Sequence, residues 1–157
     1  MPRKYESTEK FLQGDPRFNS KLVSRFVNCL MWEGKKSTAQ RAMYRALDIV
    51  REKVPDQDVL EVFNQALNNI KPFIEVRSKR VGGATLQVPH EIKRNRQQSL
   101  AIRWLIEAAR AKKGRPMARR LAEEVIDAYN KQGAAMTKRE NTHKMAEANK
   151  AFAHFAW

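Results

Sequence analysis

The feature that most constrains the fold is a helical spacing of apolar residues that recurs along most of the chain. Apolar side chains return every three or four positions, which places them on one face of an α-helix. Six segments have this spacing, and the last begins at either residue 134 or residue 137. They cover residues 20–31, 37–54, 56–70, 92–112, 116–129 and 134–152. The pattern predicts a mainly α-helical bundle.

Polar residues mark the expected starts of several helices. Asn19 or Ser20 can cap the first helix, because the side-chain oxygen of either residue accepts a hydrogen bond from a free amide of the first turn. Ser37 with Gln40, and Thr137 with Glu140, have the capping-box spacing. These signals favour helix starts at or just after residues 20, 37 and 137.

One segment breaks the helical pattern. Residues 73–89 alternate apolar and polar side chains, are rich in β-branched residues and carry Gly82-Gly83 at their centre. This is the signature of a β-hairpin with a tight turn. An isolated two-stranded hairpin is only marginally stable in water, so we expect it to protrude and to be ordered by a binding partner.

The length of 157 residues fits one domain. Residues 1–18 have no periodicity and are expected to form an irregular N-terminal arm. Residues 19–157 are expected to form one helical domain, with the β-hairpin at about residues 73–89. The fold class predicted is thus mainly α, a single-domain bundle of about six helices with one protruding β-hairpin between helices three and four.

The positive charge is concentrated in one part of the chain. The net charge is +14, and residues 77–120 hold 13 Lys or Arg against two acidic residues. Residues 37–76 and 121–157 are close to neutral. Lysine and arginine bind phosphates and release counterions, so this region is predicted to contact a polyanion.

Arginines form a line on the fourth predicted helix. Arg96, Arg103 and Arg110 are seven residues apart, which keeps them nearly on one side of a helix. Lys93 and Arg94 precede them in the first turn, where cations oppose the helix dipole. Cations placed against the dipole indicate a role in binding rather than in folding.

The hairpin carries its own cations. Arg77, Lys79 and Arg80 precede the Gly82-Gly83 turn, and alternation places Arg77 and Lys79 on one face. Glycines at the tip permit close approach of the backbone to a ligand. Charge does not separate DNA from RNA as the partner.

No catalytic or metal-binding set is recognisable. The three histidines are far apart, and Cys29, the one cysteine, is predicted to be a packed thiol of the first helix. Glu123, Glu124 and Asp127 are expected on a solvated helix face, with pairs Arg119–Glu123 and Arg120–Glu124 at i, i+4. We therefore expect no metal, no cofactor and no enzymatic activity.

No apolar run approaches the roughly 18 residues that span a membrane, and the first residues lack an apolar signal core. A cytoplasmic protein without membrane contact is expected.

Several segments together form a recognisable set of motifs. They are Phe26–Asn28, Gly34–Lys36, Glu75–Ala84, Gln87–Pro89, Arg96–Trp104 and Lys144–His154. On these motifs the chain resembles bacterial small-subunit ribosomal protein seven, from about residue 15 to its end.

The resemblance implies a helical bundle with a protruding hairpin, built into the head of the small ribosomal subunit. It implies direct binding to the 3′ major domain of the ribosomal RNA and nucleation of head assembly. The hairpin tip, with Arg77, Lys79, Arg80, Val81, Gly82 and Gly83, would lie near the exit-site tRNA and the mRNA path. The C-terminal helix would lie toward a neighbouring protein, and family members contact proteins nine and eleven.

Charge and resemblance together predict a set of RNA-binding side chains. They are Arg3, Lys4, Lys10, Lys35, Lys36, Lys93, Arg94, Arg96, Arg103, Arg110, Lys112, Lys113, Arg115 and Arg119.

Two other functions remain open at this point. A helical DNA-binding regulator would account for the charge, although no dimer seam is recognisable. An RNA-modifying enzyme would need a nucleotide or methyl-donor site, and no glycine-rich loop supplies one.

Overall fold

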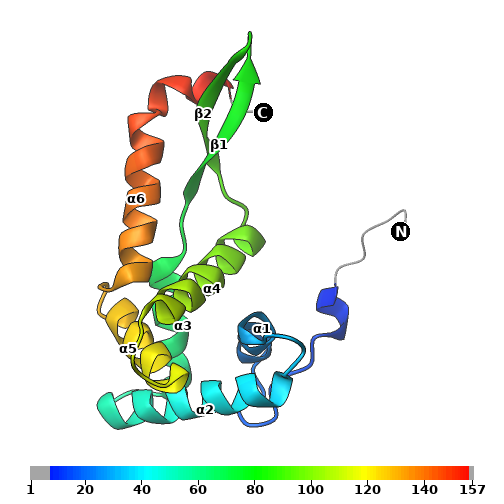
Figure 1. The fold of residues 1–157 in the computed structure, drawn as a ribbon, viewed down its shortest axis with the longest axis vertical. Coiled ribbons are helices and arrows are strands. Elements are labelled where there is room, and N and C mark those ends of the chain that lie inside the picture. Colours follow the sequence, from blue (N-terminus) through cyan, green and yellow to red (C-terminus); the bar gives the residue numbers. More distant parts are fainter. Residues whose placement is uncertain (1–7, 156–157) are drawn as a thin grey trace. The chain divides into compact units, whose positions relative to one another are not determined.

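A computed structural model of the chain describes residues 8–155. These residues form six α-helices and one two-stranded antiparallel sheet, which lies between the third and fourth helices as predicted (Figure 1). The chain divides into two compact units that meet between Met43 and Tyr44, within the second helix. The division of the chain at residue 18 stays a prediction.

The unit that ends at Met43 holds a 3-10 helix η1 (Thr8–Phe11), helix α1 (Lys21–Leu30) and the start of α2 (Lys36–Lys53). Ser20 caps α1, and its Oγ accepts a hydrogen bond from Val23 N at 3.5 Å, as the sequence predicts. Part of the expected arm is ordered, because the buried Asp15 carboxylate accepts hydrogen bonds from the backbone of Arg17 and Phe18.

Cys29 is exposed, so the prediction of a packed thiol is wrong. The buried side chains of α1 include Val23, Phe26, Val27 and Leu30. Cys29 lies outside this stripe, since the helical rotation turns it toward solvent.

The unit that begins at Tyr44 contains the larger core. Helix α3 (Val59–Ile70) packs on α4 (Arg94–Ala111) and α5 (Met117–Tyr129), and α6 (Ala134–Ala148) contacts all three. The apolar stripes predicted from the sequence face inward. The core includes Ala46, Leu47, Val50, Val62, Phe63, Leu67, Ile70, Leu105, Leu121 and Val125.

Strands β1 (Ile74–Val81) and β2 (Ala84–Glu91) form the hairpin, with Val81 opposite Ala84 and Ile74 opposite Glu91. Gly82 and Gly83 make the turn with φ of 56° and 90°, which glycine adopts at least cost. Helix α6 lies along the hairpin, and the 3-10 helix η2 (Lys150–Phe155) packs on β2 (Figure 1). The hairpin protrudes from α3, α4 and α5 as expected, and α6 and η2 of its own chain pack on it. That a binding partner orders it stays a prediction.

One helix start differs from its capping-box prediction, and another decides a choice that the sequence left open. Helix α2 begins at Lys36 and therefore includes Ser37. Helix α6 begins at Ala134, so Thr137 lies inside it and its hydroxyl donates to the carbonyl of Gly133 at 3.0 Å. Gly133, with φ of 93°, makes the turn that starts α6 three residues earlier.

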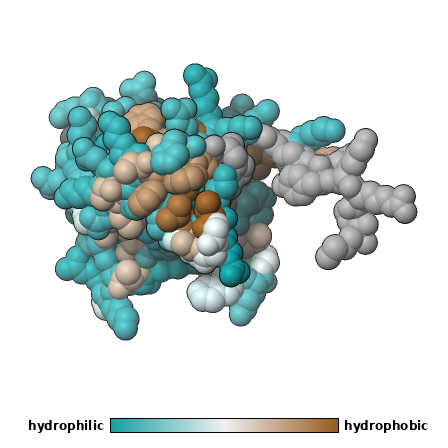
Figure 2. All heavy atoms as spheres, turned by 90° about the horizontal axis from the view of Figure 1, so that it is seen from above, coloured by the Kyte–Doolittle hydropathy of each residue, from teal (hydrophilic) through white to brown (hydrophobic). Residues whose placement is uncertain are grey.

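Hydrophilic residues cover most of the face that Figure 2 presents, and apolar residues form a limited area among them. The hairpin and η2 contribute partly exposed apolar side chains, among them Val81, Leu86, Phe152 and Phe155. Among residues 8–155, no helix combines the length and the apolar character needed to cross a membrane.

Candidate nucleic-acid interface

The arginine line of α4 is present and exposed. Leu100, Ala101 and Trp104 on this helix are buried, and their burial fixes the rotation of α4. Arg96, Arg103 and Arg110 fall on exposed positions as a consequence. The helix thus presents guanidinium groups along its length, and guanidinium geometry suits phosphate oxygens.

The start of α4 is strongly positive. Lys93 is the N-cap residue, its side chain makes no capping hydrogen bond, and the first turn holds no acid. Lys93 and Arg94 are both exposed. Cations here oppose the helix dipole by roughly 0.3–1 kcal/mol each, so an anion bound at this end would relieve the repulsion.

Glu75 joins the hairpin to α4. Its carboxylate lies 2.6 Å from Arg77 Nη2 and 3.2 Å from Arg96 Nη2, and its side chain is only 11% exposed. Burial raises the pKa of Glu75, but the hydrogen bonds and charges of Arg77 and Arg96 outweigh it and hold that pKa below its usual value. Arg77 and Arg96, two predicted site residues, are brought together at this carboxylate.

Lys79 and Arg80 have different environments on β1. Lys79 Nζ donates to the carbonyl of Phe155 in η2 at 2.9 Å, so this lysine helps to hold the chain end against the hairpin. The Arg80 side chain is exposed and makes no hydrogen bond or ion pair within residues 8–155. Val81 is partly exposed, and Gly82 and Gly83 are exposed.

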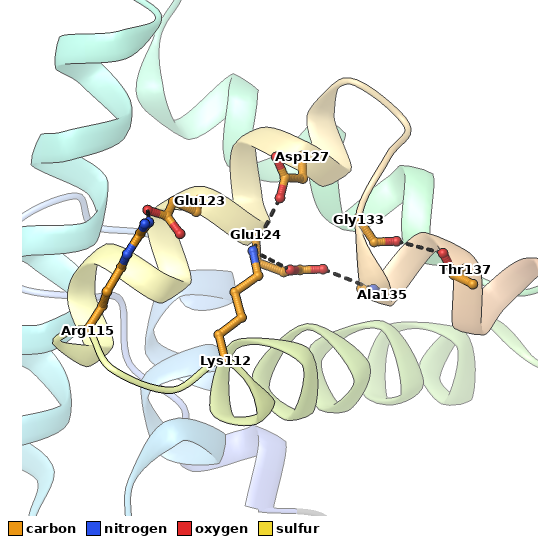
Figure 3. A network of polar contacts seen from close by, with 8 residues as sticks. All are labelled: Lys112, Arg115, Glu123, Glu124, Asp127, Gly133, Ala135 and Thr137. Atoms are coloured by element: carbon orange, nitrogen blue, oxygen red, sulfur yellow. Dashed lines mark hydrogen bonds and ion pairs between the residues drawn. The ribbon is translucent and has the colours of Figure 1, made fainter.

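Lys112, one of the predicted RNA-binding cations, forms ion pairs with two carboxylates of α5 (Figure 3). Its Nζ lies 2.9 Å from Glu124 Oε2 and 3.3 Å from Asp127 Oδ2. Burial lowers the pKa of Lys112, but Glu124 and Asp127 outweigh this and hold the pKa above its ordinary value. Glu124 Oε1 also accepts a hydrogen bond from Ala135 N at 2.9 Å.

The prediction of a solvated Glu123–Glu124–Asp127 face is therefore wrong at Glu124, which is 0% exposed. The predicted pairs with Arg119 and Arg120 do not form. Glu123 instead pairs with Arg115 at 2.5 Å (Figure 3). The packing of α4 and α6 on α5 covers Glu124. The i, i+4 spacing describes neighbours within one helix and does not predict how helices pack on one another.

Arg120 has a structural role that the sequence did not indicate. Its Nη1 donates to the carbonyl of Arg110 at 3.3 Å and to that of Lys112. These carbonyls belong to the C-terminal end of α4, where a cation is favoured by the dipole. Lys113 and Arg119, by contrast, are exposed and make no side-chain contact of this kind within the described residues.

Arg45 is a further cation that sequence reasoning missed. It lines a hollow of about 360 Å³ with Asp48, Ile49, Pro116 and Arg119. The near-neutral charge of residues 37–76 concealed it, because acidic residues of the segment, Asp48 of the same hollow among them, offset its cations. Arg41 and Arg45, four residues apart on α2, were the available signal.

The unit that ends at Met43 contains further predicted RNA-binding cations. Lys10 is exposed near the end of η1, Lys35 is exposed in the turn before α2, and Lys36 is exposed at the first position of α2. Lys35 Nζ lies 2.8 Å from Glu33 Oε2. Arg3 and Lys4 lie outside the described residues.

No group of three or more metal-ligating side chains occurs within residues 8–155. A second hollow, of about 640 Å³, is lined by Gln57, Glu61, Asn64, Gln65, Asn68, Asn69, Tyr129 and Lys131.

Comparison with known proteins decides the class. Residues 2–150 match the family described as Ribosomal protein S7p/S5e. The chain belongs to this ribosomal protein family. Small ribosomal subunit protein uS7 of Rhodopirellula baltica is 60% identical over 152 residues, covering 96% of this chain and 97% of that protein. The protein of the same name from Thermotoga maritima is 55% identical over 155 residues, covering 99% of both chains.

As a member of the S7p/S5e family, the chain is a structural component of the small ribosomal subunit, in the cytoplasm, and not an enzyme. The RNA-modifying enzyme and the DNA-binding regulator are therefore excluded. The resemblance stated from the sequence motifs is confirmed.

Proposed function

We propose that the chain binds the 3′ major domain of the small-subunit ribosomal RNA directly and nucleates assembly of the subunit head. Family membership supports a ribosomal RNA partner, and the charge of residues 77–120 supports a phosphate-binding surface. The RNA-binding residues of this proposal are the cations named from the sequence.

The observation that carries the proposal is a set of exposed cations without internal partners. Their side chains make no ion pair or hydrogen bond within residues 8–155. An exposed surface with unneutralised charge gains by releasing counterions from a nucleic acid. The set comprises Lys36, Arg80, Lys93, Arg94, Arg103, Lys113 and Arg119.

The predicted cations fall into two functional groups in this proposal. Arg77, Arg96, Lys79 and Lys112 hold elements together through their ion pairs and hydrogen bonds. Arg77 and Arg96 are still 45% and 46% exposed, so they can contact phosphate from the outer side. Rigid cations of this kind favour binding, since little side-chain entropy is lost on contact.

For the hairpin tip we propose a position near the exit-site tRNA and the mRNA path. A Cβ built on Gly82 or Gly83 would meet no atom within 4 Å, so the tip has open space around it. Arg80 supplies a cation beside it. The partly exposed Phe152 and Phe155 of η2 support contact with a neighbouring small-subunit protein, for which proteins nine and eleven are the candidates.

The test is a salt titration of binding to a transcript of the 3′ major domain. We expect the logarithm of affinity to fall linearly with the logarithm of salt concentration, by about 0.7–0.9 per phosphate contact. Arg103→Ala should reduce this slope by about one contact. Lys131→Ala removes an exposed cation from the near-neutral segment 121–157 and should leave the slope unchanged.

Salt-insensitive binding, or equal effects of Arg103→Ala and Lys131→Ala, would overturn the proposed surface.

A further inference from the structure

The turn between α1 and α2 presents a tryptophan to solvent. Trp32 is 71% exposed, whereas Trp104 in α4 is 7% exposed. An indole has one of the largest apolar surfaces of any side chain, with a π face that stacks on flat rings. Exposure of this side chain is a cost in the free protein that binding can recover.

The backbone holds this turn in a defined shape. Lys35 N donates to the carbonyl of Trp32 at 2.9 Å, and Lys36 N donates to the carbonyl of Gly34 at 2.8 Å. Glu33 and Gly34 have φ of 52° and 73°, so two successive left-handed residues reverse the chain. Trp32 is thus attached to an ordered turn between two helices.

Cations lie next to this tryptophan in the same turn. Lys36 is exposed, makes no ion pair within the described part of the chain, and opens α2. Lys35 pairs with Glu33, and both side chains are 67% exposed, so water and salt readily compete for this pair. The first turn of α2 holds no acid, which leaves its positive end uncompensated.

We propose that Trp32 stacks on an unpaired base of the ribosomal RNA, and that Lys35 and Lys36 contact the phosphates beside that base. A π face with adjacent cations is the combination by which proteins bind single-stranded nucleic acid. The base must be unpaired, because a side chain does not reach the face of a base inside an A-form helix. This inference rests on the proposed RNA binding and adds a contact that does not depend on charge.

Stacking and phosphate contacts respond differently to salt, so a salt titration distinguishes their contributions to affinity. Removal of a stacked aromatic lowers affinity roughly 5- to 150-fold per base. Such a loss should be the same at every salt concentration. Loss of a phosphate contact reduces the salt slope itself.

The experiment measures binding of the full chain to the 3′ major domain transcript over a series of salt concentrations. Trp32→Ala should lower affinity at least 5-fold with an unchanged slope, and Trp32→Phe should restore most of the loss. Lys36→Ala should reduce the slope by about 0.7–0.9. Met145→Ala, which removes a 53% exposed apolar side chain from α6, is the matched control and should bind normally.

Fluorescence gives a second readout. In a Trp157→Phe background the indoles are Trp32 and the buried Trp104, so quenching on RNA addition would report stacking at Trp32. Trp32→Phe in that background should abolish the quenching.

Normal affinity of Trp32→Ala, with the steep salt dependence intact, would overturn this inference and leave the proposed RNA binding standing. Absence of salt-dependent binding by the native chain would overturn the proposed function itself. Loss of affinity in Trp32→Phe equal to that in Trp32→Ala would show that the ring face is not the contact.

Discussion

At the scale of single residues, side chains of the same type have different roles because their surroundings differ. Glu124 is buried and paired, whereas Glu123, its neighbour in α5, pairs at the surface. His143 and His154 also differ in their surroundings. His143 Nε2 accepts a hydrogen bond from Phe73 N at 3.2 Å at the base of the hairpin, and His154 is exposed.

His143 makes stability depend on pH. Burial lowers the pKa of His143, and the charge of Arg139 lowers it further. Because the unfolded pKa is higher, about 6.5, the unfolded chain takes up the proton first. The contribution of His143 is fully present above that value and is lost as pH falls through 6.5 toward the folded pKa. Thermal unfolding between pH 7.5 and 5.5 should therefore show a falling midpoint.

His143→Gln should remove this part of the pH dependence, because an amide oxygen can still accept from Phe73 N but does not titrate. His154→Gln is the control and should keep the native pH profile. An unchanged profile in His143→Gln would assign the effect to other groups.

At the scale of elements, a few polar contacts connect helices and strands that the sequence leaves separate. Glu75 ties β1 to the start of α4, and Lys79 ties β1 to η2. Lys112 and Glu124 connect the end of α4 to α5, and Glu124 continues to the first turn of α6. The cationic helix and the hairpin are positioned by these connections.

Breaking the Lys112–Glu124 pair should destabilise the chain. Lys112→Ala would leave a carboxylate buried without its cation, and we expect a loss of about 3 kcal/mol, since the lysine is one-third exposed. Glu124→Gln retains an acceptor for Ala135 N and should cost only about 1 kcal/mol. Denaturant unfolding measures both values.

Arg115→Ala breaks the more exposed pair with Glu123 and should cost less than about 1 kcal/mol. If it cost as much as Lys112→Ala, burial would not be the cause of the difference.

At the scale of the whole molecule, the charge of +14 opposes folding and favours binding. Salt should therefore act in opposite directions on the two processes. From about 0.1 M to about 1 M salt the Debye length falls from roughly 10 Å to roughly 3 Å, which screens repulsion among exposed cations.

We expect the melting temperature of the free protein to rise by several degrees over this range, while affinity for RNA falls. Thermal unfolding in potassium chloride checks the first part. A falling melting temperature would mean that surface pairs such as Lys138–Glu107 contribute more than the repulsion costs.

Sequence patterns placed the elements and the family correctly, because helical periodicity, the Gly82-Gly83 turn and the motifs are local in the chain. They also located the basic region, since charge is a property of composition. The start at Ser37 was missed, and the choice between residues 134 and 137 stayed open, because a capping box competes with the conformation of the preceding turn.

Only the tertiary structure decided which cations are available to a ligand and which form ion pairs or hydrogen bonds within the fold. Arg96 meets a carboxylate 21 residues away, and Lys79 meets a carbonyl 76 residues away. The packing that buries Glu124 likewise involves three helices. Such contacts depend on where elements meet in space, and neither spacing nor charge along the sequence encodes that directly. The sequence by itself therefore determined the helices, the hairpin and the basic region. The tertiary packing determined whether each charged side chain connects elements of the fold or faces solvent.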